Sequence, residues 1–274
     1  MPRTTTYDLL LDSSFFSPIQ MQPLAIGRLG FNAGARWLKE HVCSHRDLVY
    51  RHQVGIVLWA WELHYVEPLG FHAADEAQVE VTARVRGPRT QLECRMTITG
   101  PEGVAVDMRA ISVPLALSGD AALSGAPHAL PDAIVERFEE DELEPVPYRS
   151  EIARTRGALA REGRLVAETA EPFRIHRHNC EVADQWFWAE SLGFAAGGRE
   201  ELVARHAAEH PEVRRGLGAP VRRIDATHLK AYQFLDRGTV STTAYEWDGS
   251  LVFLHDLSLA DDGRDVHATA IERF

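Results

Sequence analysis

The segment from Phe173 to Glu190, FRIHRHNCEVADQWFWAE, gathers side chains that can do chemistry. It holds two histidines, an asparagine, a cysteine and two acids ahead of a run of three aromatic residues. A carboxylate one turn into a helix can act as a nucleophile or as a base for water. The free N–H groups at the start of the same helix can polarise a carbonyl. The residue types of this segment therefore indicate a site in which a carboxylate, or a water that it activates, attacks a carbonyl carbon.

Three residues are the candidates for catalysis: Asn179, Glu181 and Asp184. We expect a helix over 180–194, in which the two acids, three positions apart, share one face. Asn179 then lies close enough to orient a water or to donate to the carbonyl oxygen. The alternative is plain capping, because asparagine is a good N-cap residue and acids favour the first turn of a helix. The sequence leaves both interpretations open.

The candidates for substrate binding are His178, Trp186 and Trp188, together with Asn32 at the presumed start of a first-half helix. The two tryptophans are expected in the core or in the lining of a pocket. Cys180 could act as a thiol nucleophile at a helix start. This alternative is less favoured, because no base lies at a defined spacing from it.

Metal binding is not predicted. His41 and His45 have the i, i+4 spacing of a metal pair, but the chain has no HExxH pattern and no third placed ligand. It also lacks a GxSxG elbow, a Walker A motif and a dinucleotide-binding glycine fingerprint. We expect no metal and no cofactor.

The remaining elements are expected in the same order in both halves. Apolar residues at helical spacing predict a helix over 27–45, with Phe31, Ala35, Leu38 and Val42 on its buried face. Strands are expected at 54–66, 77–86, 90–99 and 104–117 and, in the second half, at 224–235, 238–247, 250–259 and 264–274. A second helix is predicted over 199–216.

The common order indicates an internal duplication. A shift of 160 positions places Val106, Ala110 and Ile111 on Val266, Ala270 and Ile271. Placing Trp37 on Trp188 needs a shift of 151. The predicted domains are 1–118 and 166–274, joined by a Gly-, Pro- and Ser-containing linker at 119–165 that includes an acid run at 139–142.

Composition narrows the class of protein. The net charge of −11 repels phosphate backbones, which argues against nucleic-acid binding, although a local basic patch such as VRRG or PVRRID can still serve an anionic carrier. No apolar run approaches the ~20 residues of a membrane span. Three widely spaced cysteines are expected to be reduced thiols. We expect a cytoplasmic protein, with homodimerisation left open.

The segment NCEVADQWF resembles a motif of the double-hotdog acyl-carrier-protein thioesterases, N-x-H-V-N-N-x-x-Y, which is followed by a tryptophan and a glutamate. Asn179 matches the first asparagine and Val182 the valine, and Phe187 stands for the tyrosine. Glu181 occupies the histidine position, and Ala183 and Asp184 occupy the two later asparagines. The resemblance implies an α+β fold, a tandem hotdog in which each half wraps an antiparallel sheet around a central helix.

The resemblance also implies hydrolysis of an acyl thioester carried by coenzyme A or an acyl carrier protein, in fatty-acid or polyketide biosynthesis. Other reactions stay open. Double-hotdog acyltransferase/decarboxylases of the leinamycin type have a similar first helix, but their nucleophilic tyrosine falls where this chain has Trp59 and Trp61. A polyketide cyclase or isomerase is another alternative. The changed motif also allows a non-catalytic acyl-carrier-binding protein.

Overall fold

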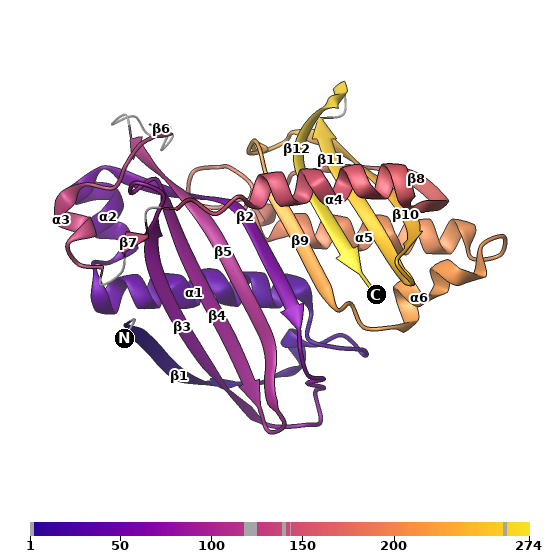
Figure 1. The fold of residues 1–274 in the computed structure, drawn as a ribbon, viewed down its shortest axis with the longest axis horizontal. Coiled ribbons are helices and arrows are strands. Elements are labelled where there is room, and N and C mark those ends of the chain that lie inside the picture. Colours follow the sequence, from indigo (N-terminus) through magenta and orange to yellow (C-terminus); the bar gives the residue numbers. More distant parts are fainter. Residues whose placement is uncertain (1–2, 118–124, 139–140, 143, 260–261) are drawn as a thin grey trace. The chain divides into compact units, whose positions relative to one another are not determined.

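The computed structural model describes residues 3–117, 125–138, 141–142, 144–259 and 262–274. The chain divides into two compact units, Met1–Pro147 and Tyr148–Phe274 (Figure 1). The division falls inside the range 119–165 that was predicted as a linker, although Tyr148–Glu162 within that range forms a helix of the second unit. Part of that segment, 118–124, and the first two acids of the predicted acid run, Glu139 and Glu140, lie outside the described residues.

The first unit is an antiparallel sheet against one long helix. Along the sheet the strands follow the order β1-β3-β4-β5-β2. The main elements are β1 (Thr4–Leu10), α1 (Pro23–His41), β2 (Val54–Tyr65), β3 (Glu76–Arg86), β4 (Gln91–Gly100) and β5 (Gly103–Leu117). Shorter elements are η1 (Ser13–Phe15), α2 (His45–His52), β6 (Gly125–Pro127), α3 (Asp132–Val135) and β7 (Asp141–Glu142).

The strand predictions for this unit are confirmed to within about one residue at each end. In β3, Val79, Val81 and Val85 are fully buried, while Gln78 and Glu80, on either side of Val79, are exposed. This alternation is the period of two that places one face of a strand against a core.

The helix prediction for this unit is correct in type but shifted. A proline suits the first helical position, and α1 begins at Pro23, four residues before the predicted start at 27. Ser44 accepts a hydrogen bond from the Asp47 N–H and starts a separate helix, α2, where the predicted helix would have ended. The predicted buried face is also partly wrong, because Phe31 is 43% exposed. Tertiary packing buries Ile26, Leu29, Ala33 and Trp37 in its place.

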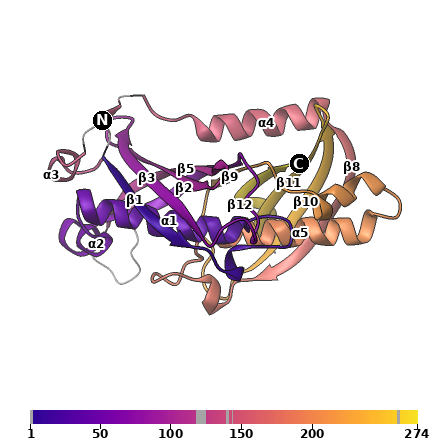
Figure 2. The same ribbon diagram turned by 90° about the horizontal axis from the view of Figure 1, so that it is seen from below.

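The second unit repeats the arrangement. Its strands follow the order β8-β10-β11-β12-β9. The main elements are α4 (Tyr148–Glu162), β8 (Arg164–Arg174), α5 (Glu190–His206), β9 (Arg223–His228), β10 (Arg237–Trp247), β11 (Ser250–Leu259) and β12 (Asp262–Arg273). Shorter elements are η2 (Arg177–Asn179), η3 (Pro211–Arg214) and α6 (Arg215–Gly218). In Figure 2, α4 and α5 lie on opposite faces of this sheet.

The four strands predicted for the second unit are confirmed in type, but β8 was not predicted. The hairpin predicted at Asp248–Gly249 is present, with both residues in the left-handed region and Trp247 paired with Ser250. Strand β9 is shorter than predicted and ends at His228. The predicted turn after β11 includes Asp261, which lies outside the described residues.

Both helix predictions for the second unit need correction. A single helix, α5, runs through the end of the first predicted helix and the beginning of the second. The second was expected to continue to 216, but the chain leaves the helix after His206, and Pro211 opens η3 instead. Proline has no N–H and its ring clashes with the preceding turn of a helix.

The duplication is visible in the topology. The order β1-β3-β4-β5-β2 becomes β8-β10-β11-β12-β9 when each strand is replaced by its counterpart, with α1 and α5 in the same place in the chain. The predicted superposition of Trp37 on Trp188 is wrong, since Trp37 lies late in α1 and Trp188 precedes α5. Among the described residues no helix is long and apolar enough to cross a membrane.

Candidate active site at the start of helix α5

The chain between β8 and α5 is a folded loop, and the helix predicted to begin at 180 begins ten residues later, at Glu190. Two backbone N–H groups explain the delay. The N–H of Trp186 donates to the Tyr232 carbonyl at 2.9 Å, and the N–H of Phe187 donates to the Asn179 carbonyl at 2.7 Å. Because these donors are committed to distant partners, the local helical preference is overridden.

At the start of α5, Asn179 and Glu190 form a buried pair. The Asn179 Nδ2 donates to Glu190 Oε2 at 2.9 Å, and Asn179 Oδ1 accepts the backbone N–H of His176 at 3.0 Å. Each of the two residues is only 7% exposed. A carboxylate on the first residue of a long helix also lies at the positive end of the helix dipole. The loop and the helix thus hold a carboxylate in one orientation.

Glu190 was not among the predicted catalytic residues. The sequence did contain a signal, since Glu190 matches the glutamate that follows the tryptophan in the thioesterase motif. An acid in the first turn of a helix is, however, expected on capping grounds alone. Only the contact with Asn179 distinguishes it from a cap.

Glu181 and Asp184 do not share a helical face, because no helix forms there. They are joined by a turn, in which the Asp184 N–H donates to the Glu181 carbonyl at 3.2 Å, and both side chains are exposed. Asp184 forms an ion pair with Arg177. The protein atoms around the Glu181 carboxyl raise its pKa above the ordinary value, a shift that the Ala183 N–H partly offsets. The structure thus places Asn179 with Glu190 rather than with these two acids.

Trp186 lies in the loop between Asn179 and Glu190 and is buried in the core of the second unit. It is 5% exposed, and its ring meets that of Tyr232 at 4.8 Å and 76° and that of His228 at 5.9 Å. Together with Phe194 of α5 it belongs to the apolar core of the second unit. Trp188 is half-buried and approaches His228 at 6.4 Å between ring centroids. Trp186 therefore lies in the core, one of the two predicted positions, while a pocket-lining role for either tryptophan stays a prediction.

Behind Trp186 lie three buried polar side chains that the sequence reading missed. They are His228 at the end of β9, Tyr232 in the following loop and His267 on β12, and all are less than 10% exposed. Within the described residues, both ring nitrogens of His228, the Tyr232 hydroxyl and the His267 Nδ1 have no hydrogen-bond partner. Burial, together with the nearby charge of Arg149, lowers the pKa of His228 to about 3. His228 is therefore neutral at pH 7 and can donate a hydrogen bond, but it is a poor base.

The other predicted residues are placed apart from the Asn179–Glu190 pair. His178 is exposed in η2, with its ring 5.8 Å from that of His176. Asn32 belongs to the first unit, where it is exposed in the middle of α1 and not at its start. Burial raises the pKa of the Cys180 thiol, and Asp184 raises it further. That direction disfavours a thiolate nucleophile.

A second polar chain in the same unit is structural. Thr242 Oγ1 and His255 Nδ1 are 2.9 Å apart, His255 Nε2 lies 3.3 Å from Glu272 Oε2, and Glu272 pairs with Arg199 of α5. The order of hydroxyl, imidazole and carboxylate resembles a hydrolytic triad. However, Thr242 and His255 are fully buried, so no substrate can reach the hydroxyl. Across the described residues, no group of three His, Cys, Asp or Glu is placed to hold a metal.

Comparison with solved structures identifies the fold. A Lactobacillus plantarum protein that carries the name oleoyl thioesterase superposes with a TM-score of 0.72 at 8% identity, over 99% of this chain and 95% of the other. The 12:0-ACP thioesterase of Umbellularia californica gives 0.69 at 11% identity, over 98% and 93%. An acyl-ACP thioesterase of Bacteroides thetaiotaomicron gives 0.65 at 12% identity, over 99% and 97%. No protein-family sequence model and no curated protein sequence matches the chain.

These likenesses span both units, and at such low identity they bear on the fold alone. The chain has the double-hotdog fold of these thioesterases, an α+β fold with two sheet-and-helix units in tandem. The predicted fold class is confirmed.

Proposed function

We propose that the protein hydrolyses acyl thioesters carried by coenzyme A or an acyl carrier protein. The observation that carries this proposal is the buried Asn179–Glu190 pair at the start of the central helix of the second hotdog unit. The solved structures with this double-hotdog fold include enzymes described as acyl-ACP thioesterases. A buried carboxylate fixed by an amide beside a helix start suits water activation at a carbonyl.

In the proposed reaction the Glu190 carboxylate accepts a proton from a water that Asn179 helps to orient. The water oxygen bonds to the thioester carbonyl carbon, and the carbon–sulfur bond then breaks. The proton passes to the departing sulfur, so the products are a carboxylic acid and a free thiol. Trp186 and Trp188 line the acyl side, and His178 lies on the carrier side. Asn32 is a substrate-binding candidate of the first unit.

Glu181 and Asp184 are the second pair of candidate carboxylates in this proposal. The pKa of Glu181 is raised by the protein atoms around its carboxyl group, which is the direction that a carboxylate base needs. Asp184 is engaged by Arg177. The two sets of carboxylates can be separated by mutation.

The test is release of free thiol from a panel of acyl-CoA and acyl-carrier-protein substrates of increasing chain length. We expect Glu190→Gln to lower kcat about 100-fold or more, in the range of a lost general base. Asn179→Ala should lower it by less. Glu200→Gln, an exposed acid on the same helix, is the control. If Glu190→Gln keeps full turnover and the double variant Glu181→Ala, Asp184→Ala loses it, the catalytic base is one of those two acids and not Glu190.

Full turnover by all of these variants would sink the proposed site, and no turnover of any thioester by the unmodified protein would sink the proposed function. Tight binding of an acyl carrier without turnover would instead support a non-catalytic binding protein. Mass spectrometry of the carrier-bound product separates hydrolysis from acyl transfer, decarboxylation or cyclisation.

For the acyl-transfer alternative no tyrosine is presented as a nucleophile at the expected strand. Trp61 is fully buried there, and the Tyr65 hydroxyl donates to the Met21 carbonyl at 2.7 Å. The proposal places the enzyme in the cytoplasm, in fatty-acid or polyketide biosynthesis, and leaves a homodimer open. The genes adjacent to its own are the direct check of that context.

A further inference from the structure

Two arginines face each other at the end of the second sheet. Arg174 ends β8 and Arg237 begins β10, and the register of these antiparallel strands pairs them directly. Residues paired in this way carry their side chains on the same face, a few ångströms apart, and like charges in that position repel. Both residues are exposed. The fold therefore maintains a local concentration of positive charge at a cost in stability.

No carboxylate within the described residues neutralises this pair. Neither arginine takes part in an ion pair or a side-chain hydrogen bond there. The nearest acid along the chain, Asp236, accepts the Gln233 N–H at 2.7 Å, and Asp184 is held by Arg177. Neither acid forms an ion pair with Arg174 or Arg237 within the described residues. On a chain with a net charge of −11, such an uncompensated pair is unusual and needs an explanation.

Along the chain, the pair is close to the candidate active site, since only five positions separate Arg174 from Asn179. Phe173 stacks on Phe194 of α5 at 4.4 Å, so the adjacent Arg174 points to the opposite face of the sheet. From Arg174 the chain passes through His176 and η2 to Asn179. Five residues span at most about 17 Å. An extended ligand whose reactive end is at Asn179 can therefore reach both guanidinium groups around the end of β8.

We propose that Arg174 and Arg237 bind the phosphate of the pantetheine arm of the thioester carrier. This inference rests on the proposed thioesterase function. Coenzyme A and acyl carrier proteins share this chemistry, since in both the thiol is separated from a phosphate by a long, flexible pantetheine chain. A guanidinium group binds phosphate through two parallel hydrogen bonds, and two such groups together match its charge. Bound phosphate would also remove the repulsion between the arginines.

The experiment compares thioesters of one acyl chain on pantetheine, which has no phosphate, on 4′-phosphopantetheine, on coenzyme A and on a carrier protein. The variant is Arg174→Gln with Arg237→Gln. We expect its KM to rise about ten-fold or more for the three phosphorylated substrates, with kcat unchanged and with KM for the pantetheine thioester unchanged. The matched control is Arg214→Gln with Arg215→Gln, which removes the same charge from two exposed arginines of the same unit.

Each pattern of KM changes either supports the phosphate site or overturns it. If KM rises for the coenzyme A and 4′-phosphopantetheine thioesters but not for the carrier-protein thioester, the site binds the free coenzyme and not the carrier protein. A rise for coenzyme A alone overturns the proposal, because the group that is bound would then be on the nucleotide. The proposal is also overturned if KM for the pantetheine thioester rises as much as KM for the phosphorylated substrates. The same holds if the control variant shows the same rise in KM.

If no thioester is turned over, the proposed function fails but the phosphate site is still tested. Calorimetric titration with coenzyme A and with pantetheine then replaces kinetics. Affinity for coenzyme A that falls about ten-fold in the variant supports the site. Absence of binding, or equal affinity in the variant, overturns it.

Discussion

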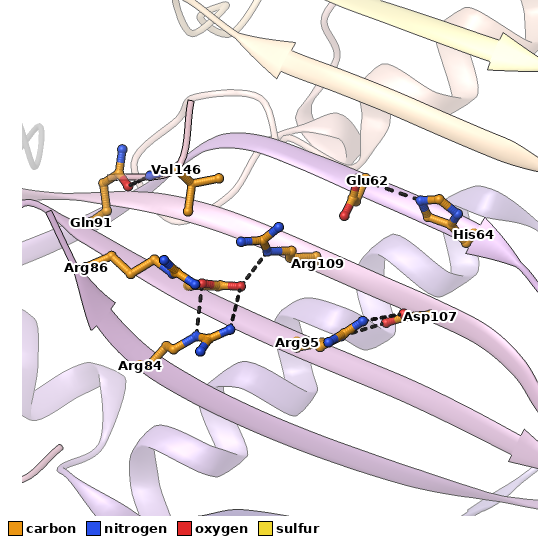
Figure 3. A network of polar contacts seen from close by, with 10 residues as sticks. Glu62, His64, Arg84, Arg86, Gln91, Arg95, Asp107, Arg109 and Val146 are labelled. Carbon is orange, nitrogen blue, oxygen red and sulfur yellow. Dashed lines mark hydrogen bonds and ion pairs between the residues drawn. The ribbon is translucent and has the colours of Figure 1, made fainter. Parts of the chain in front are cut away.

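The two units share a topology but bury their central carboxylates on opposite faces of the sheet. In the first unit, Cys94 and Met108 face the glycines of α1, so the neighbouring Glu93 and Arg109 face away from the helix. Figure 3 labels Arg84, Arg86 and Arg109 on this sheet. All three arginines form ion pairs with the Glu93 carboxylate. These arginines keep 30%, 13% and 27% of their side chains exposed.

In the second unit the equivalent charge is on the helix side. Glu272 is 1% exposed and is held by Arg199 of α5, of which 11% is exposed, and by His255, which is fully buried. Although burial opposes ionisation, Arg199 and His255 lower the pKa of Glu272 to about 2. An outer-face arginine that loses its partner can turn to water, whereas a charge under a helix cannot. The position of a buried ion relative to the helix thus decides how much of the stability of the fold depends on the partner of that ion.

The largest effect that we expect is from breaking the pair under α5. Glu272→Gln leaves the Arg199 charge buried and should lower the free energy of unfolding by about 3–5 kcal/mol. Glu93→Gln, the matched change on the outer face, should cost only about 1–3 kcal/mol. Urea unfolding measures the change in the free energy of unfolding of the whole protein. Hydrogen exchange shows which of the two units has lost stability.

Arg199→Met combined with Glu272→Gln is the control, and it should recover part of the stability because no charge is left uncompensated. Equal losses for Glu93→Gln and Glu272→Gln would contradict the comparison.

The second prediction concerns pH. The ordinary pKa of 6.5 is lowered to about 3 in folded His228, so neutral His228 contributes stability above pH 6.5 that is lost as the pH falls toward 3. The slope is at most ~1.4 kcal/mol per pH unit. In His228→Gln, the free energy of unfolding of the second unit should depend less on pH between pH 6.5 and 5. This interval lies above the range in which carboxylates titrate. Burial also lowers the pKa of His45 in the first unit, and His45→Gln should flatten the curve less. Equal pH dependence in His228→Gln and the unmodified protein would be incompatible with a neutral, buried His228.

The third prediction uses the contact of each helix with its sheet. A Cβ on Gly198 of α5 would lie 2.5 Å from Thr242 Oγ1, an atom fixed by its hydrogen bond to His255. Gly198→Ala should therefore cost about 1–3 kcal/mol in thermal unfolding. In α1, a Cβ on Gly30 would meet the flexible end of Met108, and Gly30→Ala should cost less.

Gly197→Ala is the control for helix propensity, because a Cβ there has no neighbour within 4 Å among the described residues. It should stabilise α5 by up to about 1 kcal/mol. A stabilising Gly198→Ala would show that α5 lies further from the sheet.

The smallest effect concerns the exposed arginines. In the first sheet, Arg95 has a carboxylate partner, Asp107, at 2.8 Å, whereas Arg174 and Arg237 of the second sheet face each other. Asp107→Asn should cost roughly 0.5 kcal/mol. Arg174→Gln should instead stabilise the protein, by about 0.2–1 kcal/mol, because it removes a like-charge pair. The two melting temperatures should move in opposite directions, and a shift in the same direction would refute the contrast.

Strands β2 to β5 and β9 to β12, and the duplication, could be predicted because their signals are local, whereas β1 and β8 were not predicted. Alternation such as Val79, Val81 and Val85 reports one buried face, and Asp248–Gly249 supplies the left-handed backbone of a tight hairpin. Helix boundaries were less predictable. The start of α5 depends on hydrogen bonds from Trp186 and Phe187 to carbonyls that lie outside any local window.

The hydrogen-bond partner of Asn179 was not predicted from the sequence. Asn179 is in the segment that the sequence singled out, while its partner is Glu190 and not Glu181 or Asp184. His228 and His267 could not be found, because nothing in β9 or β12 marks a histidine that will be buried without a partner. Their contact with Trp186 and Tyr232 arises only when the strands and the loop are assembled.

The sequence alone determined the class of the fold, the tandem order of its elements and the segment that enters the central helix of the second unit. These follow from periodicity and turn chemistry, which act over a few residues. The tertiary structure alone decided which carboxylate Asn179 holds, on which side of each sheet a buried charge lies, and that Arg174 meets Arg237. Those contacts join residues 7 to 73 positions apart, and only the pairing register and the packing of the helices bring them together.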